Sequence, residues 1–198
     1  MTEPGDRALA EGSDMPAGLR ALAAGLEALV LPCNCLDCGR PFAPRSALLG
    51  LCPDCAERLT ESLEPRCPRC SLPLPPGLSR GPCLDCVRAP PPWTRLDVAW
   101  LYAAPLDRVV RAIKFGRLEF LAEELGCRLA ERFDDPLRGV DVLIPVPLHW
   151  RRRLRRGFDQ ADAIARAIGR RTGIPVASAL RRRRATRPQA RRPRGGRL

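Results

Sequence analysis

The sequence lacks the features that would place it in a membrane or in an oxidising compartment. No apolar run is long enough to cross a bilayer, and residues 1–14 are polar and acidic where a secretory signal would be apolar. These absences predict a cytoplasmic protein with no membrane span. Because that compartment keeps thiols reduced, the ten cysteines indicate metal ligands in preference to disulfides.

Histidine, lysine and aromatic residues are also scarce. The one histidine, His149, is expected to hydrogen-bond within a loop, because the cysteines can satisfy metal ions without it. Lys114 is the one lysine among 34 basic residues, which suggests a compact contact to phosphate, although chance explains it equally well. Aromatic residues form 5% of the chain and none lies in residues 181–198, so base stacking contributes little in that tail.

Eight of the ten cysteines form four Cys-x-x-Cys pairs between residues 35 and 86. Each pair can hold a metal ion from a tight turn, and two pairs complete the four-sulfur shell of a structural zinc. The second half repeats the first about 32 residues later, including a proline three residues after the second thiol. Cys33 competes with Cys35 for the first site, and the matched repeat favours Cys35. We predict two Zn²⁺ ions, held by Cys35, Cys38, Cys52, Cys55, Cys67, Cys70, Cys83 and Cys86.

Positive charge is concentrated towards the C-terminus. The formal net charge is +12, and residues 149–198 contain seventeen arginines against two aspartates. A basic region of this kind suggests phosphate ligands or nucleic acid as partners. A GC-rich coding sequence that raises the arginine content everywhere is an equally good explanation.

Composition divides the chain into four regions. Residues 1–30 form a leader with a short amphipathic helix, and residues 31–88 form the metal module. The proline-rich residues 88–92 make a stiff linker to a second unit over residues 93–180. Residues 181–198 contain arginine, proline and glycine without periodicity and are expected to be disordered.

The second unit alternates strand and helix patterns, which predicts an α/β fold. Strands are expected at 96–102 and, buried and parallel, at 141–147; helices are expected from Pro105 and over 118–133, with Cys127 in the core. A basic loop over 148–157 should lead to a helix that Asp159 caps and Gly173 ends, before a strand at 174–176. The core face of that helix is predicted to carry Ala161, Ile164, Ala165 and Ile168.

This order of motifs resembles the ComF family of bacterial proteins over roughly residues 30–190. The match rests on the paired cysteines, on Lys114-Phe115-Gly116, on the Pro-Val-Pro-Leu end of the strand, and on the stretch 156–160, Arg-Gly-Phe-Asp-Gln. Thr186 and Gln189 resemble the start of a further family segment. The resemblance implies a small double zinc ribbon at 31–88, followed by a partial type I phosphoribosyltransferase-like (Rossmann-like) domain. It also implies a link to natural competence, the uptake of external DNA.

Ligands and partners follow from the same resemblance. A 5-phosphoribosyl diphosphate or a nucleotide would bind together with Mg²⁺, and the loop after the Pro-Val-Pro strand would lie near the pyrophosphate. DNA, or proteins of the DNA-uptake machinery, would be the partners. A solvated basic loop explains the arginines equally well. The expected phosphate-binding residues are Lys114, Arg152, Arg153, Arg156 and Gly157.

Two departures from the family pattern limit what the resemblance implies. Asp159 stands where the family usually has Asn, which removes a hydrogen-bond donor and keeps the ability to cap a helix. No stretch matches the family signature of four apolar residues, two acidic residues and a Thr/Gly-rich turn, because the acidic pairs at 123–124 and 134–135 lead into no such turn. We therefore expect a C-terminally truncated or frame-shifted chain, without catalytic residues and with residues 93–198 marginally folded. An active phosphoribosyltransferase, if the C-terminus is completed, and a zinc-dependent nucleic-acid-binding protein that uses the arginine tail are the alternatives.

Overall fold

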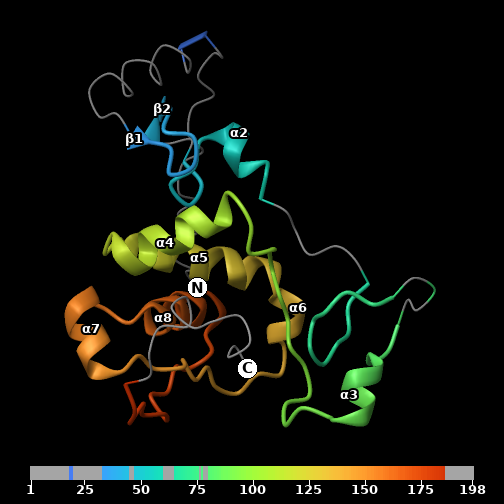
Figure 1. The fold of residues 1–198 in the computed structure, drawn as a ribbon. Coiled ribbons are helices and arrows are strands. Elements are labelled where there is room, and N and C mark those ends of the chain that lie inside the picture. The colour runs from blue at the N-terminus through green and yellow to red at the C-terminus, as the bar shows by residue number, and fades with distance from the viewer. Residues whose placement is uncertain are drawn as a thin grey trace, which may run out of the picture.

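The computed structural model of the chain describes residues 18–19, 33–44, 47–59, 65–75, 77 and 80–185. The cysteine-rich half contains the short strands β1 (Cys33–Asn34) and β2 (Pro41–Phe42), which pair antiparallel, and the helices α2 (Pro53–Ala56) and α3 (Leu84–Arg88). The other half contains α4 (Leu106–Phe115), α5 (Glu119–Arg132), α6 (Asp134–Leu137), α7 (Trp150–Arg156) and α8 (Gln160–Thr172). Figure 1 shows β1, β2 and α2 on one side of the longer helices and α3 on another.

Two predicted regions fall almost wholly outside the described residues. Of the amphipathic helix expected in residues 1–30, only Gly18 and Leu19 are described, and both are helical. The tail beyond residue 185, with Thr186 and Gln189, is not among the described residues. Within the described ranges, no helix has the length and apolar content that crossing a bilayer requires.

The first cysteine module, residues 33–59, shares one hydrophobic core with the long helices. Leu49 and Leu51 are fully buried and cluster with Val109 of α4 and Leu121 of α5. The backbone N–H of Leu49 also donates a hydrogen bond of 2.8 Å to Glu124 Oε1, which lies on α5. The first module and the helices therefore bury their apolar surfaces against each other and depend on each other for stability.

The second cysteine module, residues 65–88, has a small core of its own. Cys67, Leu74 and Cys86 form a cluster separate from the main one. The chain that follows the module lies against it, because Trp93 Nε1 donates a 2.6 Å hydrogen bond to the carbonyl oxygen of Arg69. Since it shares no core cluster with the helices among the described residues, the second module contributes little to their stability.

Helices α5 and α8 make the main helix–helix contact of the second half. Gly126 of α5 allows it, since a Cβ atom there would lie 2.6 Å from both Ala167 Cβ and the carbonyl oxygen of Ile164. The helices predicted from Pro105 and over 118–133 are confirmed as α4 and α5. Cys127, expected in the core, is half-buried.

Both predicted ends of α8 are confirmed. The Asp159 side chain accepts a hydrogen bond from the backbone N–H of Ala161 and caps the helix, and Gly173 ends it in the left-handed conformation with φ 77°. The predicted core face was partly wrong. Ala163 and Ala167 are buried with Ala165. Ala163 belongs to the main core cluster, and Ala167 lies where α8 approaches Gly126 closely.

The predicted strands form only in part. Residues 96–102 make no ladder, and Trp100 alone takes part in a single bridge. The parallel direction predicted for 141–147 and 174–176 is correct, because Leu143 pairs in parallel with Val176. The predicted burial is wrong: Val146 is 69% exposed, since no described element covers that side of the strand. The described chain thus has a cysteine-rich module and a helical region, and the phosphoribosyltransferase-like domain remains a prediction.

The prediction of a basic loop over 148–157 is also wrong, because residues 150–156 form α7. His149 is the N-cap of this helix, and its Nδ1 accepts a hydrogen bond from the backbone N–H of Arg151 at 3.3 Å. Gly157, with φ 89°, follows the last residue of the helix. His149 is therefore a capping residue, close to the hydrogen-bonding role predicted for it. Arginine has a high helix propensity, so a run of arginines favours a helix once its end is capped.

Candidate metal centres

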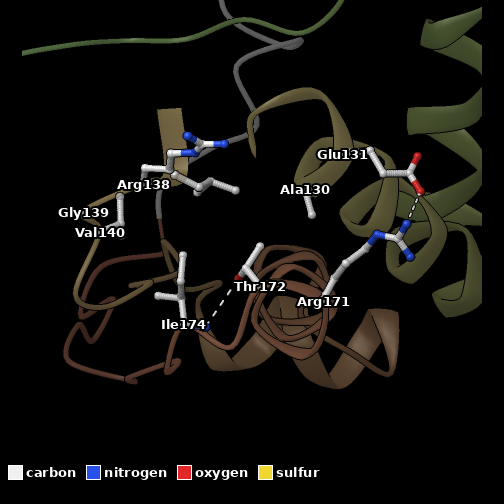
Figure 2. Close-up of a pocket in the computed structure, with 9 residues that line it drawn as sticks. Ala130, Glu131, Arg138, Gly139, Val140, Arg171, Thr172 and Ile174 are labelled. Carbon is white, nitrogen blue, oxygen red and sulfur yellow. Dashed lines mark hydrogen bonds and ion pairs between the residues drawn. The ribbon is translucent and has the colours of Figure 1, made fainter. Parts of the chain in front are cut away.

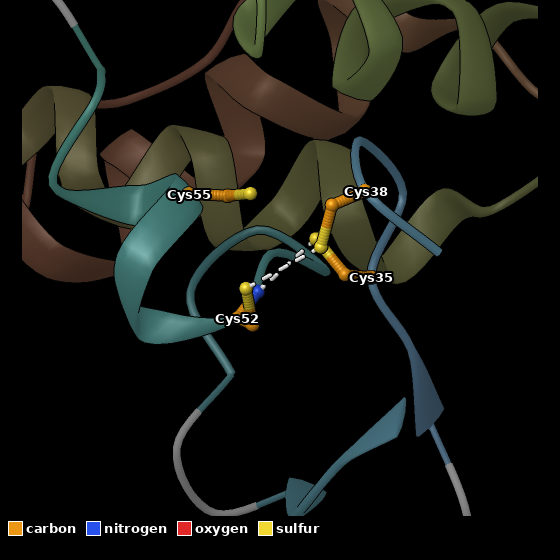
Figure 3. Close-up of side chains that lie close together, drawn as sticks. All are labelled: Cys35, Cys38, Cys52 and Cys55. Carbon is orange, nitrogen blue, oxygen red and sulfur yellow. Dashed lines mark hydrogen bonds between the residues drawn. The ribbon is translucent and has the colours of Figure 1, made fainter. Parts of the chain in front are cut away.

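The eight predicted cysteines come together in two groups of four. The sulfurs of Cys35, Cys38, Cys52 and Cys55 lie within 4.8 Å of one another, and Figure 3 shows them pointing towards a common centre. A second group within the same limit contains Cys67, Cys70, Cys83 and Cys86. Cys33 lies in β1, paired with Phe42 and outside the first group, so the structure gives the first site to Cys35.

The sulfur spacing fits a tetrahedral zinc site. A zinc–sulfur bond of about 2.3 Å places the sulfurs of such a site about 3.8 Å apart. Cys38 Sγ lies 3.8 Å from Cys52 Sγ in the first group, and Cys70 Sγ lies 3.7 Å from Cys83 Sγ in the second. Each group is thus compatible with one Zn²⁺ ion.

Each group is held by the same local structure. The first thiol pair lies on a turn in which the backbone N–H of Gly39 donates to the carbonyl oxygen of Cys35, and Ser71 repeats this bond to Cys67. Both turn residues have positive φ, 73° at Gly39 and 59° at Ser71. The second pair begins a short helix, α2 or α3, with its first cysteine at the N-cap. The sequence repeat therefore produces two copies of one metal-binding turn and helix.

Hydrogen bonds from backbone N–H groups lower the pKa of one cysteine in each group to about 6. Burial acts to raise the pKa of Cys35, but the backbone N–H groups of Cys38, Cys52 and Asp37 outweigh it and lower the pKa to about 6. Cys67 has the same balance and its pKa is also lowered to about 6. In contrast, burial and the neighbouring thiols raise the pKa of Cys55 and Cys86. At neutral pH Cys35 and Cys67 are therefore mostly thiolates, and their negative charge attracts a cation to each group.

The first site has charged neighbours that the sequence pattern did not identify. Arg58 Nη1 lies 3.8 Å from Cys55 Sγ, and Arg58 also pairs with Asp37 at 3.2 Å. Four thiolates around one Zn²⁺ carry a net charge of −2, so a nearby guanidinium stabilises the loaded site. A motif search for cysteine ligands gives no signal for this residue, because its position depends on α2.

The phosphate-binding residues predicted from the resemblance are divided between two places. Lys114 is half-buried; burial lowers the pKa of Lys114, and the charge of Arg156 lowers it further. Arg156 packs over the Phe115 ring at 5.7 Å and donates to Gln160 Oε1 at 2.7 Å. Neither Lys114 nor Arg156 forms an ion pair within the described ranges, although the charge of Asp159 acts on Arg156 from farther away. The motifs 114–116 and 156–160 thus meet in space, through the contact between Arg156 and Phe115.

Arg153 lies elsewhere, at a small pocket beside the carboxyl end of the 141–147 strand. The pocket has a volume of about 150 Å³ and is lined also by Asp159 and Asp162. Asp159 accepts hydrogen bonds from the backbone N–H groups of Leu148 at 2.7 Å and Ala161 at 3.1 Å, so a carboxylate already occupies the N-terminus of α8. Negative charge at this position disfavours phosphate there. Gly157 forms the turn that ends α7.

A larger pocket of about 670 Å³ opens between the ends of α5 and α8 (Figure 2). Two of its charged side chains pair with each other, since Arg171 lies 2.8 Å from Glu131. None of the residues predicted to bind metal or phosphate lines it. The cysteine groups are therefore the most complete sites in the described chain.

Comparisons with known proteins agree with this assignment. Residues 26–87 match the model of the double zinc ribbon domain. DNA utilization protein YhgH of Escherichia coli (strain K12) is 35% identical over 147 residues, which cover 72% of this chain and 63% of that protein. The same figures hold for YhgH of Shigella flexneri, and competence protein F of Haemophilus influenzae is 29% identical over 136 residues, covering 64% and 56%.

The chain spans less than two thirds of the length of these relatives. No solved structure matches it. The family resemblance predicted from the motifs is confirmed: the chain carries a double zinc ribbon domain and is homologous to the YhgH and ComF competence proteins.

Proposed function

We propose that this chain is a ComF-like protein of competence and DNA uptake, in which two zinc-loaded modules support binding to DNA or to proteins of the uptake machinery. The observation that carries the proposal is the pair of four-cysteine groups in a chain homologous to DNA utilization and competence proteins. The net charge of +12 suits a nucleic-acid partner. A strain that lacks the gene should take up less labelled DNA, and the wild-type gene should restore uptake.

The freshly purified, reduced protein is expected to contain two zinc ions per chain, because each four-sulfur group has the spacing of a tetrahedral site. Cys33→Ser should keep both ions, since Cys33 lies outside the first group. Elemental analysis after gel filtration measures the ratio. A ratio of zero in the wild-type protein, or a loss of one ion in Cys33→Ser, would contradict the assignment of ligands.

A second function is favoured by the packing of Arg156 over the Phe115 ring, next to Lys114 in the chain. We infer that Lys114 and Arg156 bind a phosphate group of a phosphoribosyl diphosphate or nucleotide, as the family resemblance implies. Arg152 and Gly157 are the remaining candidates, whereas Arg153 lies apart from them at the pocket that Asp159 and Asp162 line. Support comes from the two half-buried cations, neither of which forms an ion pair within the described ranges. Mg²⁺ would accompany the diphosphate sugar.

Lys114→Gln is expected to weaken the binding of pyrophosphate about tenfold, because it removes one charge-assisted contact. Arg111→Gln is the matched control, since it removes an exposed cation of the same helix that already pairs with Asp107 at 3.4 Å. Isothermal titration calorimetry in the presence of Mg²⁺ measures both. Equal affinities in the two variants would exclude Lys114 from the site. We expect no pyrophosphate release from the diphosphate sugar, because the sequence shows no acidic pair leading into a Thr/Gly turn.

A further inference from the structure

Helix α7 exposes two large apolar side chains among its arginines. None of its residues is buried, and Trp150 and Leu154 are 62% and 77% exposed. Because they are four residues apart, they lie one above the other on the same face of the helix. Figure 1 shows α7 at the edge of the helical region. Exposed apolar side chains next to each other mark a surface that binds something.

Arginines flank this apolar face on both sides. At 100° per residue, Arg151 and Arg155 lie on one side of the face and Arg153 on the other, and all three are exposed. The Arg151 guanidinium lies 5.1 Å from the centre of the Trp150 ring. Arg151 and Arg155 form no ion pair within the described ranges, whereas Arg153 lies at the pocket that Asp159 and Asp162 line. The outer face of α7 therefore carries one aromatic and one aliphatic side chain, next to arginines that form no ion pair within the described ranges.

A polyanion with exposed flat apolar groups complements such a surface. Single-stranded nucleic acid offers both, because its unpaired bases stack on aromatic rings while its phosphates contact arginines. Duplex DNA offers phosphates to the arginines, but its paired bases are not free to stack on Trp150. An anionic membrane is a poorer match, because a seven-residue helix is only about 10 Å long and inserts little apolar area.

We propose that the outer face of α7 binds single-stranded nucleic acid, with a base stacked on Trp150 and phosphates held by Arg151 and Arg155. This inference rests on the DNA-related function proposed above. It places the contact on α7, whereas the sequence alone suggested the tail 181–198. It is independent of the phosphate group proposed for Lys114 and Arg156. Arg156 lies on the inner side of α7, against Phe115 of α4 and Gln160 of α8.

Trp150→Ala is expected to weaken the binding of an oligothymidine about tenfold and to leave duplex binding unchanged, because only the single strand stacks on the ring. Tyr102→Ala is the matched control, since it removes another exposed aromatic side chain, 66% exposed and outside α7. Fluorescence anisotropy with the full chain measures both affinities. Circular dichroism should show an unchanged fold, because Trp150 is exposed.

The double variant Arg151→Gln/Arg155→Gln should weaken binding to single strands and duplex alike. It should also reduce the slope of log affinity against log salt by about 1.4 for the single strand, about 0.7 for each lost phosphate contact. Equal oligothymidine affinities of the wild-type chain and the Trp150→Ala variant would overturn the assignment to α7 and leave the DNA function standing. Absence of all DNA binding by the wild-type chain would overturn both.

Two further measurements separate other occupants of the same face. Co-sedimentation with phosphatidylserine vesicles that depends on Trp150, while oligothymidine binding does not, would assign the face to a membrane. A change of sedimentation coefficient in Trp150→Ala, without a change in oligothymidine binding, would assign it to a second copy of the chain. Either result would overturn the proposal.

Discussion

Replacing Cys52 with serine is expected to unfold the helical region together with the first module, whereas Cys83→Ser should affect the second module alone. The two cysteines are equivalent in the repeat, since each is the N-cap of a short helix and a member of a four-sulfur group. Only Cys52 belongs to the core cluster that includes α4, α5 and α8. Zinc binding supplies roughly 10 to 16 kcal/mol in small zinc peptides, which is comparable to the whole stability of a domain.

The ellipticity at 222 nm and the zinc content measure this difference together. Cys52→Ser should lose most of the helical signal and the cooperative melting transition. Cys83→Ser should keep both and lose one zinc ion. Cys33→Ser and Cys127→Ser are the cysteine controls, since neither belongs to a four-sulfur group, and both should melt like the wild type. If Cys52→Ser and Cys83→Ser melt alike, the shared core does not couple the first module to the helices.

Gly126→Ala is expected to destabilise the protein by about 2 kcal/mol or more, as overpacked core substitutions do. In an exposed helix the same change stabilises by roughly 0.5 to 1 kcal/mol, so the sign of the effect is diagnostic. The reason is the contact between α5 and α8, where a new Cβ atom would meet Ala167 Cβ and the Ile164 carbonyl oxygen at 2.6 Å. Because backbone forms part of that contact, a side-chain rotation cannot relieve the clash.

Cys127→Ala is the matched control for this substitution. It changes the next residue of the same helix to the same side chain at a half-buried position, and it should alter stability by about 1 kcal/mol or less. Urea denaturation followed by circular dichroism measures both variants. A Gly126→Ala variant as stable as the wild type would show that α5 and α8 do not approach closely in solution.

The spacing of the residues was sufficient to predict some parts of the structure. The cysteine repeat predicted both groups of four, because two cysteines separated by two residues on a turn can bind one metal ion together with the next such pair along the chain. The limits of α8 were also predictable, since Asp159 and Gly173 act on the backbone next to them. The resemblance to the ComF family rested on short motifs in a fixed order, and the homology to competence proteins confirms it.

The errors occurred where distant contacts decide the outcome. Residues 96–102 have the alternation of a strand, but a strand requires a partner, and within the described ranges only Trp100 finds a bridge. The apolar run 141–147 was expected to be buried, and its exposure reflects the absence of a covering layer among the described elements. The loop predicted over 148–157 is α7, since a stretch without apolar periodicity can still be helical when its end is capped.

The sequence alone determined that this chain carries two four-cysteine sites of equal local design, because metal-ligand spacing and turn chemistry act over a few residues. The tertiary structure decided that the two are not equal in consequence. Leu49 and Leu51 bury the first module against α4 and α5, while the second module keeps its own small core. Only packing between residues far apart in the chain distinguishes them, and the same packing places Trp150 on an exposed basic helix.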